Sequence, residues 1–138
     1  MTKISTFLII TLSLIVNALG GWDNLILTLI LFMAIDYFLG ILTAFFNKSL
    51  KSENGGLSSH ASFIGIFKKF AILLLVMIGF RFDILLEVNF IRDSVIIGFI
   101  INETISIIEN AALMGIPIPR VLKNAIDILK SKTEGGKK

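Results

Sequence analysis

The chemistry available to this chain lies in carboxylates that stand inside apolar segments. Asp36 interrupts an apolar run from Leu25 to Phe46, and Glu103 and Glu109 interrupt another. A run of about 20 apolar residues is long enough to cross the ~30 Å hydrocarbon core of a bilayer. An ionisable group at that depth costs at least ~2.5 kcal/mol, so it usually faces a partner or a water-filled space. These positions predict assembly between helices or a path for solutes, rather than a plain membrane anchor.

The polar residues of each run fall on one face of a helix. In the later run they lie within an arc of roughly 120° at ~100° per residue, and they are Asn102, Glu103, Ser106, Glu109 and Asn110. The earlier run carries a thinner stripe with i, i+4, i+7, i+11 spacing, made of Asp36, Gly40, Thr43 and Asn47. Two interpretations stay open. The stripes join helices within or between subunits, or they line an aqueous lesion once many copies assemble.

Other reactive groups are scarce in the sequence. The 138 residues include no cysteine and a single histidine, His60, which lies in a polar stretch. We therefore expect no disulfide and no metal site. The glycines at 55 and 56 lack the lysine and spacing of a phosphate-binding loop, and no nucleophile–base pair accompanies the carboxylates. We expect no enzymatic activity, no catalytic residue and no cofactor.

Composition places the chain among small integral membrane proteins. Hydrophobic residues make up 55% of the chain and charged residues only 17%, whereas a soluble domain has about a quarter of its residues charged. A soluble fold would need several helices that are apolar all round, in a core that a chain of this length cannot enclose. The net charge is +3. Because the basic residues flank apolar segments, they favour contact with anionic lipid headgroups over nucleic acid.

Four apolar blocks predict an all-α integral membrane protein with three to four transmembrane helices and a short C-terminal amphipathic helix. We expect helices at about 4–19, 25–46, 66–88 and 94–114. Residues 1–116 would form the transmembrane domain, and 117–138 a cytoplasmic, amphipathic, basic tail. The first block also has features of a cleaved secretory signal, but a retained helix is favoured because its basic start is one lysine. The third block has a short apolar core, so an interfacial or re-entrant segment stays open. Arg81 and Asp83 near its end could neutralise each other.

Basic residues set the expected orientation. The stretch 47–69 and the C-terminal region are rich in lysine, whereas the turn at 20–24 has no basic residue and the connection 81–93 has more acids than bases. Basic loops stay in the cytoplasm, so four crossings would place both termini on the cytoplasmic side of the membrane. We expect residues 120–132 to form a helix on the membrane surface and 133–138 a disordered tail. The residues assigned to topology and lipid contact are Lys48, Lys51, Lys68, Lys69, Arg120, Lys123 and Lys130.

Five short motifs in order resemble a known family. They are Asp36-x-x-x-Gly40, Gly65-Ile66-Phe67-Lys68-Lys69, Asp83 after the next apolar run, the stretch from Asn102 to Asn110, and Gly115-Ile116-Pro117-Ile118-Pro119 followed by Leu122-Lys123. Over about residues 35–132 the chain resembles the toxin-secretion/phage-lysis holins of Gram-positive bacteria and their phages, which include the clostridial toxin-release holins.

The resemblance implies a membrane-lesion function. Such proteins accumulate in the cytoplasmic membrane, associate with copies of themselves and open lesions that let an endolysin or a toxin cross, without a necessary direct contact with that cargo. The pore or assembly candidates are Asp36, Gly40, Thr43, Asn102, Glu103, Ser106, Glu109 and Asn110. Two other functions stay open: a small selective channel, and an accessory subunit or antiholin.

Overall fold

The computed structural model describes residues 2–51 and 54–134, and its regular structure in these ranges is all helical. The helices are α1 (Lys3–Ala18), α2 (Asn24–Phe45), α3 (Ser59–Leu86), α4 (Ile91–Leu113) and α5 (Arg120–Glu134). Within the described chain, α2, α3 and α4 are long and apolar enough to cross a membrane, whereas α1 has only 16 residues. The predicted all-α membrane fold, with its short C-terminal helix, is confirmed.

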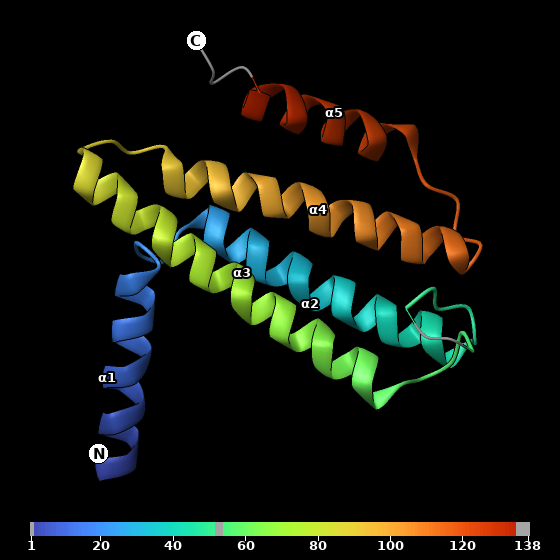
Figure 1. Ribbon diagram of the computed structural model, residues 1–138, viewed down its shortest axis with the longest axis horizontal. Helices are drawn as coiled ribbons and strands as arrows, with labels where there is room; N and C mark the ends of the chain where they lie inside the picture. Colours follow the sequence, from blue (N-terminus) through green and yellow to red (C-terminus); the bar gives the residue numbers. More distant parts are fainter. Residues whose placement is uncertain (1, 52–53, 135–138) are drawn as a thin grey trace.

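The three long helices form a bundle. α4 packs along α2 and against α3, and α5 lies beside α4 (Figure 1). α1 leaves the bundle at a steep angle, near the end where α2 and α4 begin and α3 ends (Figure 1). No side chain of α1 is buried. The bundle of α2, α3 and α4 therefore positions the candidate site, and α1 is an appendage to it.

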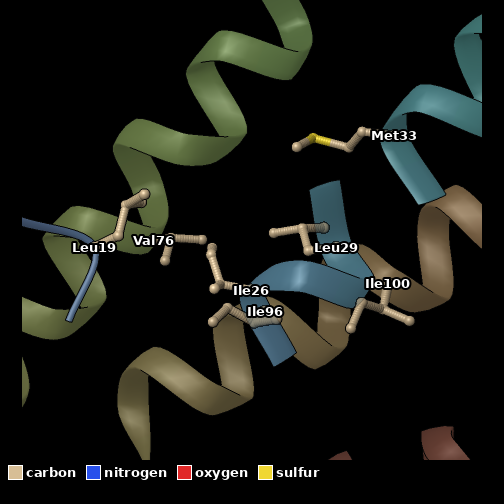
Figure 2. Close-up of a cluster of buried hydrophobic side chains, with 7 residues drawn as sticks. All are labelled: Leu19, Ile26, Leu29, Met33, Val76, Ile96 and Ile100. Atoms are coloured by element: carbon tan, nitrogen blue, oxygen red, sulfur yellow. The ribbon is translucent and has the colours of Figure 1, made fainter. Parts of the chain in front are cut away.

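Buried apolar side chains fill one half of the bundle. They come from the N-terminal halves of α2 and α4, from the C-terminal half of α3 and from the turn after α1. They are Leu19, Ile26, Leu29, Met33, Val76, Ile96 and Ile100 (Figure 2). The other half holds buried polar groups, including Asp36, Glu103 and Asn110. Many large apolar side chains, such as Phe38 and Phe70, are exposed on the outside. An apolar exterior around buried charges fits a bundle surrounded by lipid.

The third helix begins earlier than the sequence predicts. Ser58 caps it by accepting a hydrogen bond from the Ala61 N–H at 3.3 Å, so the helix starts at Ser59 rather than near residue 66. The hydropathy pattern misses the first turn because Ser59, His60, Ala61 and Ser62 are polar or small. The resulting helix of 28 residues is long enough to span a bilayer despite its lysines.

Asp83 forms no ion pair with Arg81 in the described part of the chain. The Asp83 carboxylate instead accepts hydrogen bonds from the backbone N–H groups of Ile91 and Arg92, each at 2.9 Å. Those groups belong to the first turn of α4, where peptide N–H groups lack helical partners and an anion is favoured. Asp83 thus fixes the tight connection between α3 and α4.

The predicted C-terminal helix is present as α5, which occupies residues 120–134 of the predicted tail 117–138. Ile126 of α5 is buried against the bundle, while Val121, Leu122 and Ile128 are exposed. The placement of α5 on the membrane surface and the division at residue 116 stay predictions. The predicted disordered tail falls outside the described residues, except for 133–134, which belong to α5.

Candidate functional site: a charge cluster between three helices

One lysine joins the three long helices. Lys69 of α3 places its Nζ atom 2.8 Å from Oδ2 of Asp36 on α2 and 2.5 Å from Oε2 of Glu103 on α4. The Asn110 side-chain amide of α4 also donates to Oδ1 of Asp36, at 3.3 Å. The side chains of Asp36 and Glu103 are only 8% and 9% exposed, and that of Lys69 is 18% exposed. We call these four residues the charge cluster.

The charge cluster explains how Asp36 and Glu103 can lie inside apolar helices. A buried carboxylate is tolerated when it is paired and hydrogen-bonded, and here one ammonium group serves two carboxylates from different helices. Among the described residues, no buried side-chain nitrogen or oxygen lacks a hydrogen-bond partner. Because one cation faces two anions, the cluster carries a net negative charge when both carboxylates are ionised.

A cavity opens from the charge cluster toward the α2–α3 loop. It has a volume of about 260 Å³, and its wall includes Asp36, Lys69, Glu103 and Ser106 on the helices and Lys51 in the loop. The cluster is therefore not sealed in the apolar half of the bundle. Its polar groups lie at the inner end of a path that water can enter.

The structure divides the predicted stripe of α4 between two environments. Glu103 and Asn110 are buried in the charge cluster, and Ser106 is half-buried at the cavity. Asn102 and Glu109 are exposed, although Asn102 also borders the cavity. The stripe therefore has an inner set, Glu103, Ser106 and Asn110, that lies within the bundle, and an outer pair, Asn102 and Glu109, that is exposed.

The stripe of α2 has mixed roles. Asp36 belongs to the charge cluster, and Gly40 lies beside Asn110, whose Nδ2 atom would be 4.0 Å from an added Cβ. Thr43 is fully buried, and its hydroxyl donates to the Leu39 carbonyl of the same helix at 2.7 Å. Asn47 lies beyond the helix in the left-handed conformation, with φ 55°. It is the residue after the C-cap Phe46, a position where the left-handed conformation commonly ends a helix.

Lys69 differs from the other basic residues with which the sequence analysis groups it. The remaining six are exposed: Lys48, Lys51, Lys68, Arg120, Lys123 and Lys130. Lys69 instead points into the bundle. Its position inside an apolar helix is a signal that the sequence contains, but the hydropathy pattern alone cannot distinguish a lysine that reaches the headgroups from one that turns inward.

A second polar centre, which the sequence analysis did not predict, holds the opposite end of the bundle. The buried Arg92 guanidinium of α4 donates to the Leu19 carbonyl at 2.6 Å and the Gly21 carbonyl at 3.4 Å. It also contacts the carboxylates of Asp23 at 2.7 Å and Asp93 at 2.9 Å. The hydrogen bond from Arg92 lowers the pKa of Asp23, against a smaller opposing effect of burial. We call this set the Arg92 latch, because it ties the turn after α1 to the start of α4.

Neither centre resembles a metal site. Across residues 2–51 and 54–134, no group of three or more histidine, cysteine, aspartate or glutamate side chains is arranged to hold a metal ion. The charge cluster contains a cation and an amide among its carboxylates, and this donor set suits helix association better than metal ligation.

The fold and its buried charges define a small membrane protein with several spans. The sequence profile of the bacteriophage holin family matches residues 13–131. The chain belongs to the bacteriophage holin family.

Several relatives support this assignment. An uncharacterized protein of Listeria monocytogenes is 42% identical over 115 residues, which cover 83% of this chain and 77% of the relative. An uncharacterized 14.9 kDa protein of Clostridium perfringens is 36% identical and covers 82% of each chain. A probable holin of Bacillus phage phi105 is 26% identical over 101 residues, or 72% of this chain and 70% of the phage protein. No solved structure shows significant similarity.

Proposed function

We propose that this chain acts as a holin. It accumulates in the bacterial cytoplasmic membrane with the α2–α3 loop and the C-terminus in the cytoplasm, associates with copies of itself and opens lesions through which an endolysin or a toxin crosses. Its role is non-enzymatic and needs no direct contact with the cargo. The observation that carries this proposal is the charge cluster, in which Lys69 joins carboxylates from two other spanning helices.

The charge cluster gives the subunit a closed form. While Lys69 bridges Asp36 and Glu103, the three spans present mainly apolar side chains to lipid. The exposed Asn102 and Glu109 remain costly in hydrocarbon, and a neighbouring subunit that hydrogen-bonds to them reduces this cost. Association is therefore favoured as copies accumulate, which makes it depend steeply on protein density.

Opening requires the inner set of polar groups to face water. An ion pair at 4 Å is worth roughly four times more at an effective dielectric of 20 than in bulk water. Water that spreads from the cavity to the charge cluster thus weakens the bridge that keeps the bundle closed. The helices then separate along their polar faces, and a lesion lined by α2 and α4 forms between subunits. Exposed lysines at the cytoplasmic end hold anionic headgroups throughout.

Induced expression in a bacterial host, with and without a cytoplasmic endolysin, tests the proposal. Culture turbidity and membrane potential are followed together. We expect a delay, then sudden depolarisation, with lysis only when the endolysin is present. Graded, ion-selective currents without protein release would indicate a channel, and a delay imposed on another holin would indicate an accessory subunit or antiholin.

Variants then test the role of the polar groups at equal expression. We expect Glu103→Gln and Glu109→Gln to change the time of lysis, because one alters the charge cluster and the other the outer pair. Asp127→Asn on α5 is the matched control, since it removes an exposed carboxylate outside both sets. If lysis occurs but neither glutamine variant shifts its time relative to this control, the polar stripes do not time the opening.

A further inference from the structure

A second cavity lies at the same end of the bundle as the charge cluster. Its volume is about 620 Å³, and it lies between the α2–α3 loop and the N-terminal part of α3. Lys51 and Lys68 border both this cavity and the one beside the charge cluster. The two cavities therefore meet at a pair of lysines. We call the outer cavity the loop cavity.

The wall of the loop cavity combines polar and apolar groups. Lys51, Lys68, His60 and Asn54 provide donors, and Leu57 and Ile64 provide apolar surface. Leu57 is 61% and Ile64 39% exposed, so neither is covered by the rest of the chain. Ser58 and Ala61 place the first turn of α3 in the same wall, and the peptide dipoles of a helix N-terminus add positive potential there.

The described charges around the two cavities leave a positive excess. Three lysines, Lys51, Lys68 and Lys69, face two carboxylates, Asp36 and Glu103. Lys69 forms ion pairs with both carboxylates. Lys51 and Lys68 are exposed and make no ion pair with another described residue. Among the described residues that line the two cavities, Lys51 and Lys68 are therefore the ammonium groups that can contact an anion.

We propose that the loop cavity binds the phosphodiester headgroup of an anionic lipid. Lys51 and Lys68 contact the phosphate oxygens, and Leu57 and Ile64 contact the start of an acyl chain. A phosphodiester such as that of phosphatidylglycerol carries one negative charge, which can contact both ammonium groups. The combination of a cationic wall with exposed apolar side chains favours a lipid over a soluble phosphate. The site rests on the membrane orientation in the proposed function but not on lesion opening.

Native mass spectrometry of the purified protein tests this site. The protein is released from micelles that contain equal amounts of phosphatidylglycerol and phosphatidylcholine, and the retained lipids are counted. We expect the wild type to retain one phosphatidylglycerol preferentially. Lys51→Gln with Lys68→Gln should reduce that retention at least roughly tenfold, because each lost lysine removes a charge-assisted hydrogen bond. Retention of phosphatidylglycerol by this double variant at the wild-type level would overturn the proposal.

Matched variants separate a built site from general attraction between charges. Lys3→Gln with Arg81→Gln removes the same charge from exposed residues that line neither cavity, and we expect retention to change by no more than about twofold, since exposed distant charges are screened. Lys51→Arg with Lys68→Arg should retain the lipid. An equal loss in the Lys3→Gln with Arg81→Gln variant, or displacement of the lipid by an equimolar soluble headgroup without acyl chains, would also overturn the proposal. Because no lysis is measured, failure of the holin function leaves this result unaffected.

Discussion

Replacing Lys69 with methionine tests whether the charge cluster controls the stability of the bundle. Methionine has a similar length without the charge, so the change removes the cation and leaves Asp36 and Glu103 facing each other. Both carboxylates are less than a tenth exposed, and removing one partner from a buried ion pair costs roughly 3–5 kcal/mol. We expect a loss in this range in the free energy of unfolding.

Neutralising one carboxylate should cost far less. Asp36→Asn or Glu103→Gln leaves Lys69 paired with the remaining carboxylate, so the buried set becomes neutral instead of unbalanced. The lost hydrogen bond is worth about 0.5–1.5 kcal/mol. Lys68→Met is the matched control, because Lys68 is the exposed neighbour of Lys69, and surface changes usually stay within about 0.5 kcal/mol.

Unfolding by sodium dodecyl sulfate in mixed micelles, followed by circular dichroism, measures these differences. We expect Lys69→Met to be much less stable than either carboxylate variant, and its combination with Asp36→Asn and Glu103→Gln to recover part of the loss. The reasoning is refuted if Lys69→Met is as mild as Lys68→Met. It is also refuted if Glu103→Gln costs as much as Lys69→Met, because charge balance would then not set the energy.

Three further predictions concern the Arg92 latch and the glycines. Gly20→Ala should lower the free energy of unfolding by roughly 1–3 kcal/mol, because Gly20 has φ +83° and an added Cβ would lie 2.8 Å from Arg92 Nε. Gly98→Ala is the matched control, because an added Cβ there would meet no atom within 4 Å. In the same detergent titration it should leave the free energy of unfolding unchanged or raise it by up to about 1 kcal/mol. Arg92→Lys should speed amide exchange around Trp22, because lysine cannot reproduce the planar fork of donors; unchanged exchange would rule the latch out. The pKa of Asp23 is lowered by Arg92, so its contribution is complete at neutral pH and is lost only as pH falls through the lowered pKa. Asp23→Asn, which keeps a helix cap, should remove that part of the acid dependence of the unfolding midpoint.

Hydropathy predicted the spans well where charges are few. The helices expected at 25–46 and 94–114 occur at Asn24–Phe45 and Ile91–Leu113. Long apolar runs bounded by polar turns leave little choice of where a helix begins and ends. The span containing Lys69 was harder to place. Its start depends on the Ser58 cap, a local hydrogen bond that an average over hydropathy does not register.

The sequence named Asp36, Glu103 and Asn110 one by one, but it assigned Lys69 to lipid contact and did not predict how the four residues are arranged. Helical spacing placed Glu103 and Glu109 on one face, yet their exposure differs because it depends on how α4 is rotated against α2 and α3. The Arg92 latch was missed for a related reason. Two of its acceptors are backbone carbonyls of the turn after α1, and a sequence does not show which carbonyls a distant turn presents to a side chain.

The order of charges along the chain has a consequence for how the protein enters the membrane. Asp36 is synthesised first, Lys69 follows 33 residues later, and Glu103 follows another 34 residues later. An isolated charge at the centre of an inserting helix costs about 2.5–3.5 kcal/mol. When α3 follows α2 into the bilayer, Lys69 meets a carboxylate that is already there, and this hairpin is neutral at the cluster before α4 adds Glu103. The last helix therefore adds its carboxylate to a partner already in place, and the cation occupies the middle position in the chain, where it can serve both neighbours.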